Sequence, residues 1–193
     1  GRIAAQLVAA EATCPIEVYS NYYLPAYVGK GSLVIACSYS GNTEETIASM
    51  DQALAKGARV CVVTSGGKML EMAKEKGLDR IVIPGGNPPR TMLAYSLTQQ
   101  FFVLRHYGII RDGFEKSIAA AAELLEREKE SIKKAALELT EKLVGKQLVI
   151  YSEASTEAVS IRFRQQVNEN SKVLCWHHAI PEMNHNELVG WAG

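Results

Sequence analysis

The chain has 193 residues, 47% of them hydrophobic, which is enough for one large or two small domains with packed cores. Its 21 lysine and arginine residues balance its 21 aspartate and glutamate residues, so no overall field favours binding to nucleic acid or to an anionic membrane. The four cysteines have neither disulfide nor metal-ligand spacing, no apolar stretch is long enough to span a bilayer, and no signal peptide is recognisable, so a cytoplasmic protein is expected.

The N-terminal residues predict a helix followed by a strand. Residues 1–12 are rich in alanine, and their apolar side chains recur at helical spacing. Pro15 should end this helix, and residues 16–19 should form a short strand that leads into a loop. Because the chain has no initiator methionine and starts within a helical pattern, we expect it to be an excerpt of a longer protein, truncated at both ends.

An apolar run, a hydroxyl-rich turn and a helix follow in direct succession. Residues 33–36, LVIA, are too few for a helix and continuously apolar, as in a strand that is buried on both faces. Ser38, Ser40 and Thr43 come next, and a predicted helix then runs to Gly57. The unpaired amides and the positive dipole end of such a helix can bind an oxyanion, which predicts a phosphate site.

The same turn has a simpler explanation. Asn42 is a favourable N-cap residue, and Glu45, three positions later, completes a capping-box pattern. Glu44 and Glu45 also complement the helix dipole without any ligand. The local residues therefore leave phosphate binding and ordinary capping both open, with the helix start at Asn42 or Thr43.

The following segments repeat the alternation of strand and helix. Residues 59–64, RVCVVT, predict a strand, residues 65–77 predict a turn and a helix, and residues 81–83 predict another strand. Connections of this kind are right-handed and give a parallel sheet with helices on both faces. Ligands of such sheets bind beyond the carboxyl ends of the strands, where the turn that contains Ser38 is expected.

Arg90 follows a loop rich in glycine and proline, residues 84–89, and opens a predicted buried helix that ends at Gly108. A cation is unfavourable at a helix N-terminus, so a paired anion would explain its position. The alternative is that Arg90 reaches solvent or a neighbouring carboxylate.

A charged, alanine-rich stretch, residues 114–144, predicts one or two amphipathic helices that separate two parts of the chain. Beyond it, a strand at 147–152, a helix at 153–170 and a strand at 172–176 predict a second, related α/β unit. The expected domains are residues 1–111, a helical connection at 112–145, and residues 146–193.

The C-terminal tail is expected to be polar and irregular, and it concentrates acid-base side chains. They are His177, His178, Glu182, His185, Glu187 and, before the preceding strand, Glu169. A metal site is disfavoured because two adjacent histidines point in opposite directions if they continue the strand. A nucleic-acid site would need basic clustering, which is missing here. Ordinary polar surface remains the alternative to catalysis.

Two parts of the chain resemble a known family. The segment SYSGNTEET, residues 38–46, resembles the sugar-phosphate motif of the SIS (sugar isomerase) domain family. NENSK, residues 168–172, and PEMNHNELVGW, residues 181–191, resemble the C-terminal-domain signature of its bifunctional phosphoglucose/phosphomannose isomerases. The resemblance implies an α/β fold of two SIS-type, flavodoxin-like units, each with three α/β/α layers and a parallel sheet, joined by a helical segment.

The resemblance also implies an activity: an isomerase that interconverts glucose 6-phosphate and/or mannose 6-phosphate with fructose 6-phosphate through an enediolate. It assigns Glu169 as the base between C1 and C2 and His185 as the aid to ring opening. Arg90 would be the cation that stabilises the enediolate, since the family has an arginine after its proline loop. The phosphate ligands would be Ser38, Ser40 and Thr43. No metal or cofactor is implied, and the expected assembly is a homodimer in which His185 comes from the neighbouring subunit.

The chain departs from the family pattern at both ends. The upstream glycine-rich phosphate loop is absent unless Gly1 is its last residue, and the C-terminal helices with a site lysine are missing. A non-catalytic SIS module that senses a phosphosugar is one alternative, although it would not need Glu169 or His185. The other alternative is a SIS isomerase that acts on a different sugar phosphate.

Overall fold

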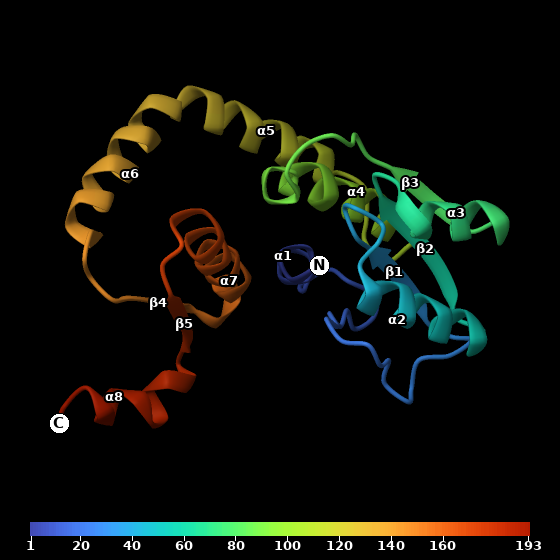
Figure 1. Cartoon of the computed structure of the whole chain (residues 1–193), viewed down its shortest axis with the longest axis horizontal. Coiled ribbons are helices and arrows are strands. Elements are labelled where there is room, and N and C mark those ends of the chain that lie inside the picture. The colour runs from blue at the N-terminus through green and yellow to red at the C-terminus, as the bar shows by residue number, and fades with distance from the viewer. The chain divides into compact units, whose positions relative to one another are not determined.

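The computed structural model describes residues 1–193, which divide into two compact units, residues 1–112 and residues 113–193. The first unit contains a three-stranded sheet and the second a two-stranded sheet, and both sheets are parallel (Figure 1). None of the helices combines the length and the apolar character needed to span a bilayer. The predicted mixed α/β fold with parallel sheets is therefore confirmed.

The sheet of the first unit has the order β1-β2-β3, with β1 at Leu33–Cys37, β2 at Arg59–Thr64 and β3 at Asp79–Val82. Helix α2, Glu44–Ala55, connects β1 to β2, and α3, Gly67–Glu75, connects β2 to β3. This agrees with the predicted alternation of strands and helices, and β2 occupies the predicted residues. All three strands consequently end at the same edge of the sheet.

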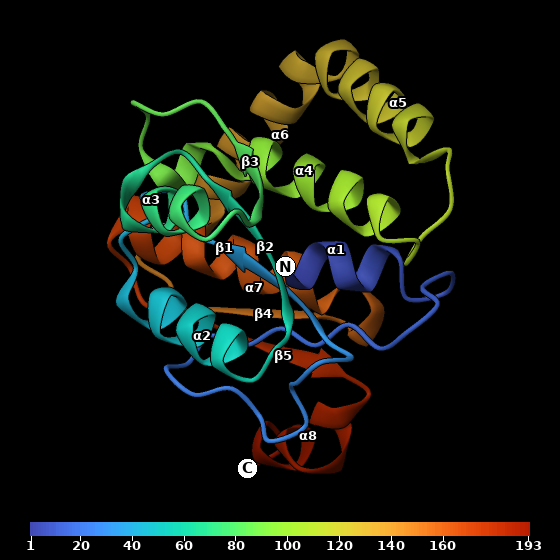
Figure 2. The same cartoon turned by 90° about the vertical axis from the view of Figure 1, so that its right-hand side faces the viewer.

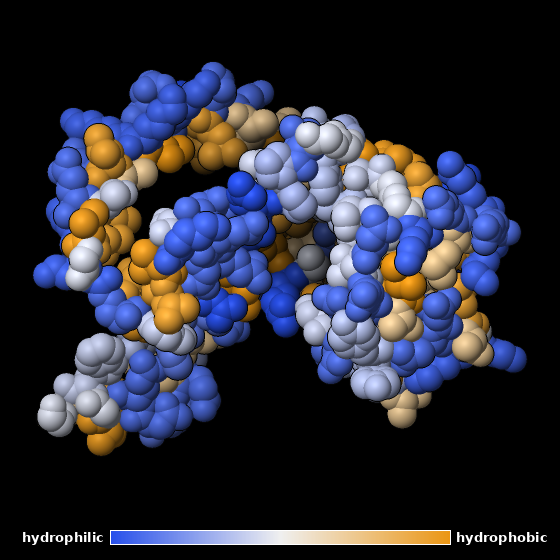
Figure 3. Space-filling view, in the orientation of Figure 1, coloured by the Kyte–Doolittle hydropathy of each residue, from blue (hydrophilic) through white to orange (hydrophobic).

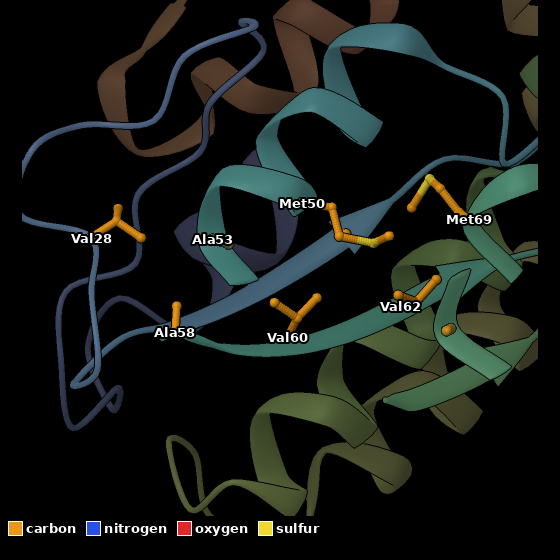
Figure 4. Close-up of a cluster of buried hydrophobic side chains, with 9 residues drawn as sticks. Val28, Met50, Ala53, Ala58, Val60, Val62 and Met69 are labelled. Atoms are coloured by element: carbon orange, nitrogen blue, oxygen red, sulfur yellow. The ribbon is translucent and has the colours of Figure 1, made fainter. Parts of the chain in front are cut away.

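Both faces of this sheet are covered. On one face, side chains of α2 and α3 pack against the strands in a cluster that includes Met50, Met69 and Val62, all with less than 2% exposure (Figure 4). On the other face, Val103 of α4, Leu93–His106, packs with Cys61 and Val63. Figure 2 shows α2 and α4 on opposite sides of β1 and β2. The fully buried character of β2 follows from this three-layer arrangement.

Three predictions for the first unit need correction. Helix α1 spans only Arg2–Leu7, and residues 16–19 form no strand, although Ile16 and Val18 are half-buried. Helix α4 begins at Leu93, so Arg90 does not open it and lies instead in a 3₁₀ turn, η1, at Pro89–Thr91. This turn follows from the two prolines at its start, because proline fixes its own φ and biases the preceding residue away from the helical region.

The second unit begins with two amphipathic helices, α5 at Phe114–Arg127 and α6 at Lys129–Leu143. Glu128 between them has φ −94° and ψ 6°, so the helical path is interrupted at this residue. Hydrophilic residues cover one side of the two helices, and exposed leucines and isoleucine gather on the other (Figure 3). Of the two predicted possibilities, one helix or two in sequence, the structure has the second.

The sheet of the second unit pairs β4, Leu148–Glu153, with β5, Cys175–Ile180. Helix α7 spans only Glu157–Gln166, because a 3₁₀ turn, η2, precedes it at Ala154–Thr156 and a π-helical turn, η3, follows it. The predicted strand at 172–176 is wrong in its bounds, since β5 starts later and includes both histidines. The tail is also more regular than expected: it forms a 3₁₀ turn, η4, at Glu182–His185 and a short helix, α8, at Glu187–Gly190.

Candidate functional site

The turn after β1, which we call the hydroxyl turn (residues 38–43), is organised by its own side chains. Ser38 Oγ lies 2.7 Å from Thr43 Oγ1 and accepts a hydrogen bond from the Gly41 amide at 3.2 Å. Ser40 Oγ accepts from the Asn42 amide at 3.2 Å. Ser38 is only 9% exposed, whereas Ser40 is exposed. The three predicted phosphate ligands therefore lie together on one short turn.

The beginning of α2 differs from the predicted capping box. Thr43 is the N-cap residue, and its side chain makes no hydrogen bond to the helix amides. Asn42 Oδ1 instead accepts from the amide of Lys68, at the start of α3, at 3.0 Å. Asn42 therefore links two helix starts rather than capping its own helix. The first amides of α2 consequently receive no side-chain cap from Thr43, which is the condition for binding an anion there.

A second turn, after β2, packs directly against the hydroxyl turn. The Met69 amide donates to Gly41 O at 3.0 Å, and Ser65 Oγ donates to Tyr39 O at 2.6 Å. Gly41 has φ +68°, and a Cβ placed on it would lie 1.8 Å from Gly66 O. Only glycine fits this approach of two backbones, so Gly41 is required by packing as well as by its dihedral angle.

The loop after β3 reaches the same edge of the sheet. The amide of Asn87 donates to Tyr39 Oη at 3.1 Å, which joins this loop to the hydroxyl turn. Arg90 is exposed and follows three residues later, in η1. The first unit thus brings the hydroxyl turn and the loop that carries Arg90 to the carboxyl ends of β1 and β3, the strands on either side of β2. Ligands of parallel sheets bind at this edge.

The thiols of Cys37, at the end of β1, and of Cys61, within β2, are not nucleophiles at neutral pH. Burial raises the pKa of Cys37 and of Cys61 to about 11, so both remain protonated. Burial, and then the hydrogen bond to Asp79, also raise the pKa of Tyr107, which packs on the same face of the sheet. The available chemistry at this edge is therefore that of hydroxyls, amides and Arg90.

In the second unit, Glu169 lies in η3, the π-helical turn at Val167–Ser171 that ends α7, and it is exposed. Neighbouring side chains fix this turn: Asn168 Nδ2 donates to Val173 O at 2.8 Å, and Lys172 Nζ donates to Glu169 O at 2.6 Å. Lys172 has φ +58°, an uncommon value for a residue with a side chain. Glu169 is thus presented on an irregular turn before β5, not on the regular helix that the sequence predicts.

His185 lies at the end of η4 and is also exposed. Glu169 precedes the amino end of β5, whereas His185 follows its carboxyl end, and a strand of six residues spans about 20 Å. The two predicted catalytic residues of the second unit therefore lie toward opposite ends of β5 in one chain.

The two adjacent histidines of β5 point in opposite directions, as predicted. His177 Nε2 lies 3.5 Å from Glu157 Oε1 of α7, while His178 Nδ1 lies 3.0 Å from Glu187 Oε2 of α8. Tyr151 of β4 donates a hydrogen bond to Glu187, and its pKa is raised by that bond. Sequence reasoning missed the contact between Tyr151 and Glu187, because the predicted strand at 172–176 ended before His178, the residue that pairs with Tyr151 in the sheet. No group of three or more metal-ligating side chains is placed to bind a metal ion.

Comparison with protein families gives two matches. Residues 11–107 match the SIS domain, and residues 132–193 match the bacterial phospho-glucose isomerase C-terminal SIS domain. The first match contains the hydroxyl turn and Arg90, and the second contains Glu169 and His185. All the predicted site residues therefore lie within the matched segments.

Related proteins match most of the chain. The chain is 41% identical over 183 residues to a bifunctional phosphoglucose/phosphomannose isomerase of Caldicellulosiruptor bescii, which covers 91% of this chain and 54% of that protein. It is 37% identical over 178 residues to the Aquifex aeolicus protein of the same name, with 92% and 53% covered. A D-glucosamine-6-phosphate 4-epimerase of Sulfolobus acidocaldarius is 30% identical over 182 residues, with 90% and 56% covered. The chain thus spans about half the length of the curated relatives it matches.

A solved structure shares the fold. The C-terminal domain of glucosamine-fructose-6-phosphate aminotransferase from Francisella tularensis aligns with a TM-score of 0.74, covering 98% of this chain and 57% of that one. The sequence identity is 16%, so this similarity concerns the fold alone.

Proposed function

Because the chain belongs to the SIS domain family, we propose that the intact protein is an isomerase that interconverts glucose 6-phosphate and/or mannose 6-phosphate with fructose 6-phosphate. The observation that carries this proposal is the 41% identity to a bifunctional phosphoglucose/phosphomannose isomerase across 91% of the chain, which includes both units. The matches confirm the resemblance expected from the sequence. The geometry of the first unit supports the proposal, because its hydroxyl turn suits a phosphate dianion.

In the proposed reaction, Ser38, Ser40 and Thr43 bind the phosphate together with the first amides of α2. Phosphate binding supplies energy far from the reacting carbons and orients them against the base. Glu169 takes the proton from C2 and returns it to C1, and Arg90 stabilises the enediolate that forms between these steps. His185 transfers the proton of the ring oxygen. The reaction moves a proton without a net change in oxidation state, so the proposal includes no cofactor.

The proposed assembly is a homodimer in which His185 of one subunit completes the site of the other. The positions of Glu169 and His185 toward opposite ends of β5 support this arrangement, because one chain alone keeps them apart along the strand. The expected domain division, with a helical connection between two SIS-type units, and a cytoplasmic location are parts of the same proposal.

A second candidate is an enzyme that acts on another sugar phosphate. The 30% identity to a D-glucosamine-6-phosphate 4-epimerase supports this candidate. The support is weaker than that for the isomerase, because the two isomerases are 41% and 37% identical to the chain. A non-catalytic phosphosugar sensor is a weaker alternative, since the chain carries both Glu169 and His185 at the positions that the isomerase resemblance requires.

The test is an assay of the intact protein with each aldose 6-phosphate in turn, with product identification by chromatography and NMR. The proposal predicts fructose 6-phosphate from glucose 6-phosphate, mannose 6-phosphate or both. Binding of these compounds without any product would favour the sensor. Conversion of glucosamine 6-phosphate alone, with inversion at C4, would favour the epimerase.

A further inference from the structure

Glu187 attaches the C-terminal helix α8 to the sheet of the second unit. One carboxylate oxygen, Oε1, accepts a hydrogen bond from the hydroxyl of Tyr151 on β4. The other oxygen, Oε2, lies 3.0 Å from Nδ1 of His178 on β5. The indole N–H of Trp191, just after α8, donates to the Tyr151 hydroxyl at 2.8 Å. Two strands and α8 therefore meet at a cluster of four side chains: Tyr151, His178, Glu187 and Trp191.

The carboxylate at the centre of this cluster is withdrawn from water. The Glu187 side chain is 24% exposed, and its Oε2 atom is inaccessible to solvent. Burial of a carboxylate is unfavourable unless polar partners replace water. The Tyr151 hydroxyl donates to Oε1, whereas Oε2 makes no hydrogen bond, although His178 Nδ1 lies 3.0 Å from it. The hydrogen bond raises the pKa of Tyr151, which keeps the tyrosine in its protonated, donating form. Glu187 thus joins α8 to β4 through its hydrogen bond with Tyr151, next to the His178 ring.

The segment that carries His185 has little stability of its own. Turn η4 and helix α8 have four residues each, which is too short for a helix to be stable in isolation. Leu188 and Val189 are 55% and 72% exposed, so apolar burial does not fix α8 either. Only Asn186 separates His185 from Glu187 in the chain, and its side chain accepts a hydrogen bond from the Glu187 amide at 2.6 Å. The position of His185 therefore depends on polar contacts two residues away.

We propose that Glu187 and Tyr151 are positioning residues that hold His185 where ring opening requires it. This inference rests on the proposed isomerase function. Glu187 and Tyr151 do not touch the substrate in this account, and they act only through the backbone that joins Glu187 to His185. Their loss should consequently lower kcat, while the affinity for the phosphosugar, which depends on the hydroxyl turn, should be retained.

The experiment compares Tyr151→Phe and Glu187→Gln in the intact protein with two matched controls, Tyr95→Phe and Glu138→Gln. Both control residues are exposed and lie outside the cluster. Because small displacements of a catalytic group can lower rates substantially, we expect kcat to fall by roughly 10-fold or more in the two test variants, with KM within about twofold. The controls should keep the wild-type kcat.

A second set of variants separates positioning from a general loss of structure. In a His185→Ala background, Tyr151→Phe should change kcat by less than about twofold, because the group that it positions is gone. In a Trp176→Phe background, Tyr151→Phe should shift the tryptophan emission to the red, because Trp191 loses its hydrogen-bond acceptor. The same change in a Trp191→Phe background should leave the emission unchanged. A further 10-fold loss of kcat in the His185→Ala background would overturn the inference.

The outcomes also separate this inference from the proposed function. Absence of isomerase turnover in the wild-type protein would refute the proposed function, and the inference with it. Normal turnover that falls in His185→Ala but not in Tyr151→Phe or Glu187→Gln would refute the positioning role alone.

Discussion

The hydroxyl oxygens of Ser38 and Thr43 lie 2.7 Å apart, across the turn that joins β1 to α2. This contact joins the two ends of the turn, and Ser38 Oγ also accepts a hydrogen bond from the Gly41 amide. A phosphate oxygen that accepts from both hydroxyls would replace this mutual hydrogen bond, and the backbone would already hold the two side chains on one turn. In the proposed site, this arrangement lowers the cost of binding.

Removal of either hydroxyl should weaken substrate binding. We expect Ser38→Ala and Thr43→Ala each to raise KM by roughly 10- to 100-fold, since hydrogen bonds to charged groups contribute about 1.5–3 kcal/mol. Steady-state kinetics and calorimetric titration with the phosphosugar would measure the effect. Ser96→Ala is the matched control, because its hydroxyl donates to a helix carbonyl, Met92 O, away from the turn. An unchanged KM in both test variants would contradict the phosphate site.

Gly41→Ala should destabilise the protein more than substitution of a glycine that has open space around it. Gly41 and Gly77 have similar dihedral angles, with φ +68° and +62°, but a Cβ on Gly77 would meet nothing within 4 Å. Gly77→Ala should therefore cost only the strain of a left-handed residue, about 1–2 kcal/mol of unfolding free energy. Gly41→Ala adds the clash with Gly66 O, and urea unfolding should show a clearly larger loss. Equal losses would mean that the two turns do not pack as described.

Stability should fall as the pH rises from about 9 to about 11. The pKa of Cys37 and Cys61 is raised from 9.0 to about 11 by burial, so the unfolded chain loses these thiol protons first. The unfolded state then binds fewer protons than the folded state, and the free energy of unfolding decreases through this range, with full stability below pH 9. Urea unfolding across this range should show a smaller decrease in Cys61→Ala. The exposed Cys14 supplies the control, because Cys14→Ala should leave the decrease unchanged.

Much of the fold follows from patterns that are local in the sequence. The apolar run at residues 59–64 forms β2 as predicted, and the alternation with α2 and α3 gives the predicted parallel sheet. Residues 16–19 show why an apolar pattern alone can predict a strand that does not form. Ile16 and Val18 alternate with exposed neighbours, but this pattern reports burial, and no strand pairs with them.

The details of the site depend on contacts between distant residues. Asn42 looks like an N-cap because Glu45 follows it, yet its partner is Lys68, 26 residues away. Tyr151 and Glu187 are separated by 36 residues, so no local motif contains both. The roles of Glu169 and His185 follow from the family resemblance and stay a proposal. The sequence motifs thus identify candidate residues, whereas the structure identifies what holds them.

The most direct measurement of the central claim is turnover of glucose 6-phosphate and mannose 6-phosphate by Glu169→Gln in the intact protein. Loss of the base should lower kcat by roughly 10²- to 10⁴-fold and stop solvent deuterium incorporation at C2, while calorimetry still shows phosphosugar binding. Glu138→Gln, an exposed change on α6, should behave as the wild type. Undiminished turnover by Glu169→Gln would contradict the account, because another group would then have to remove the C2 proton.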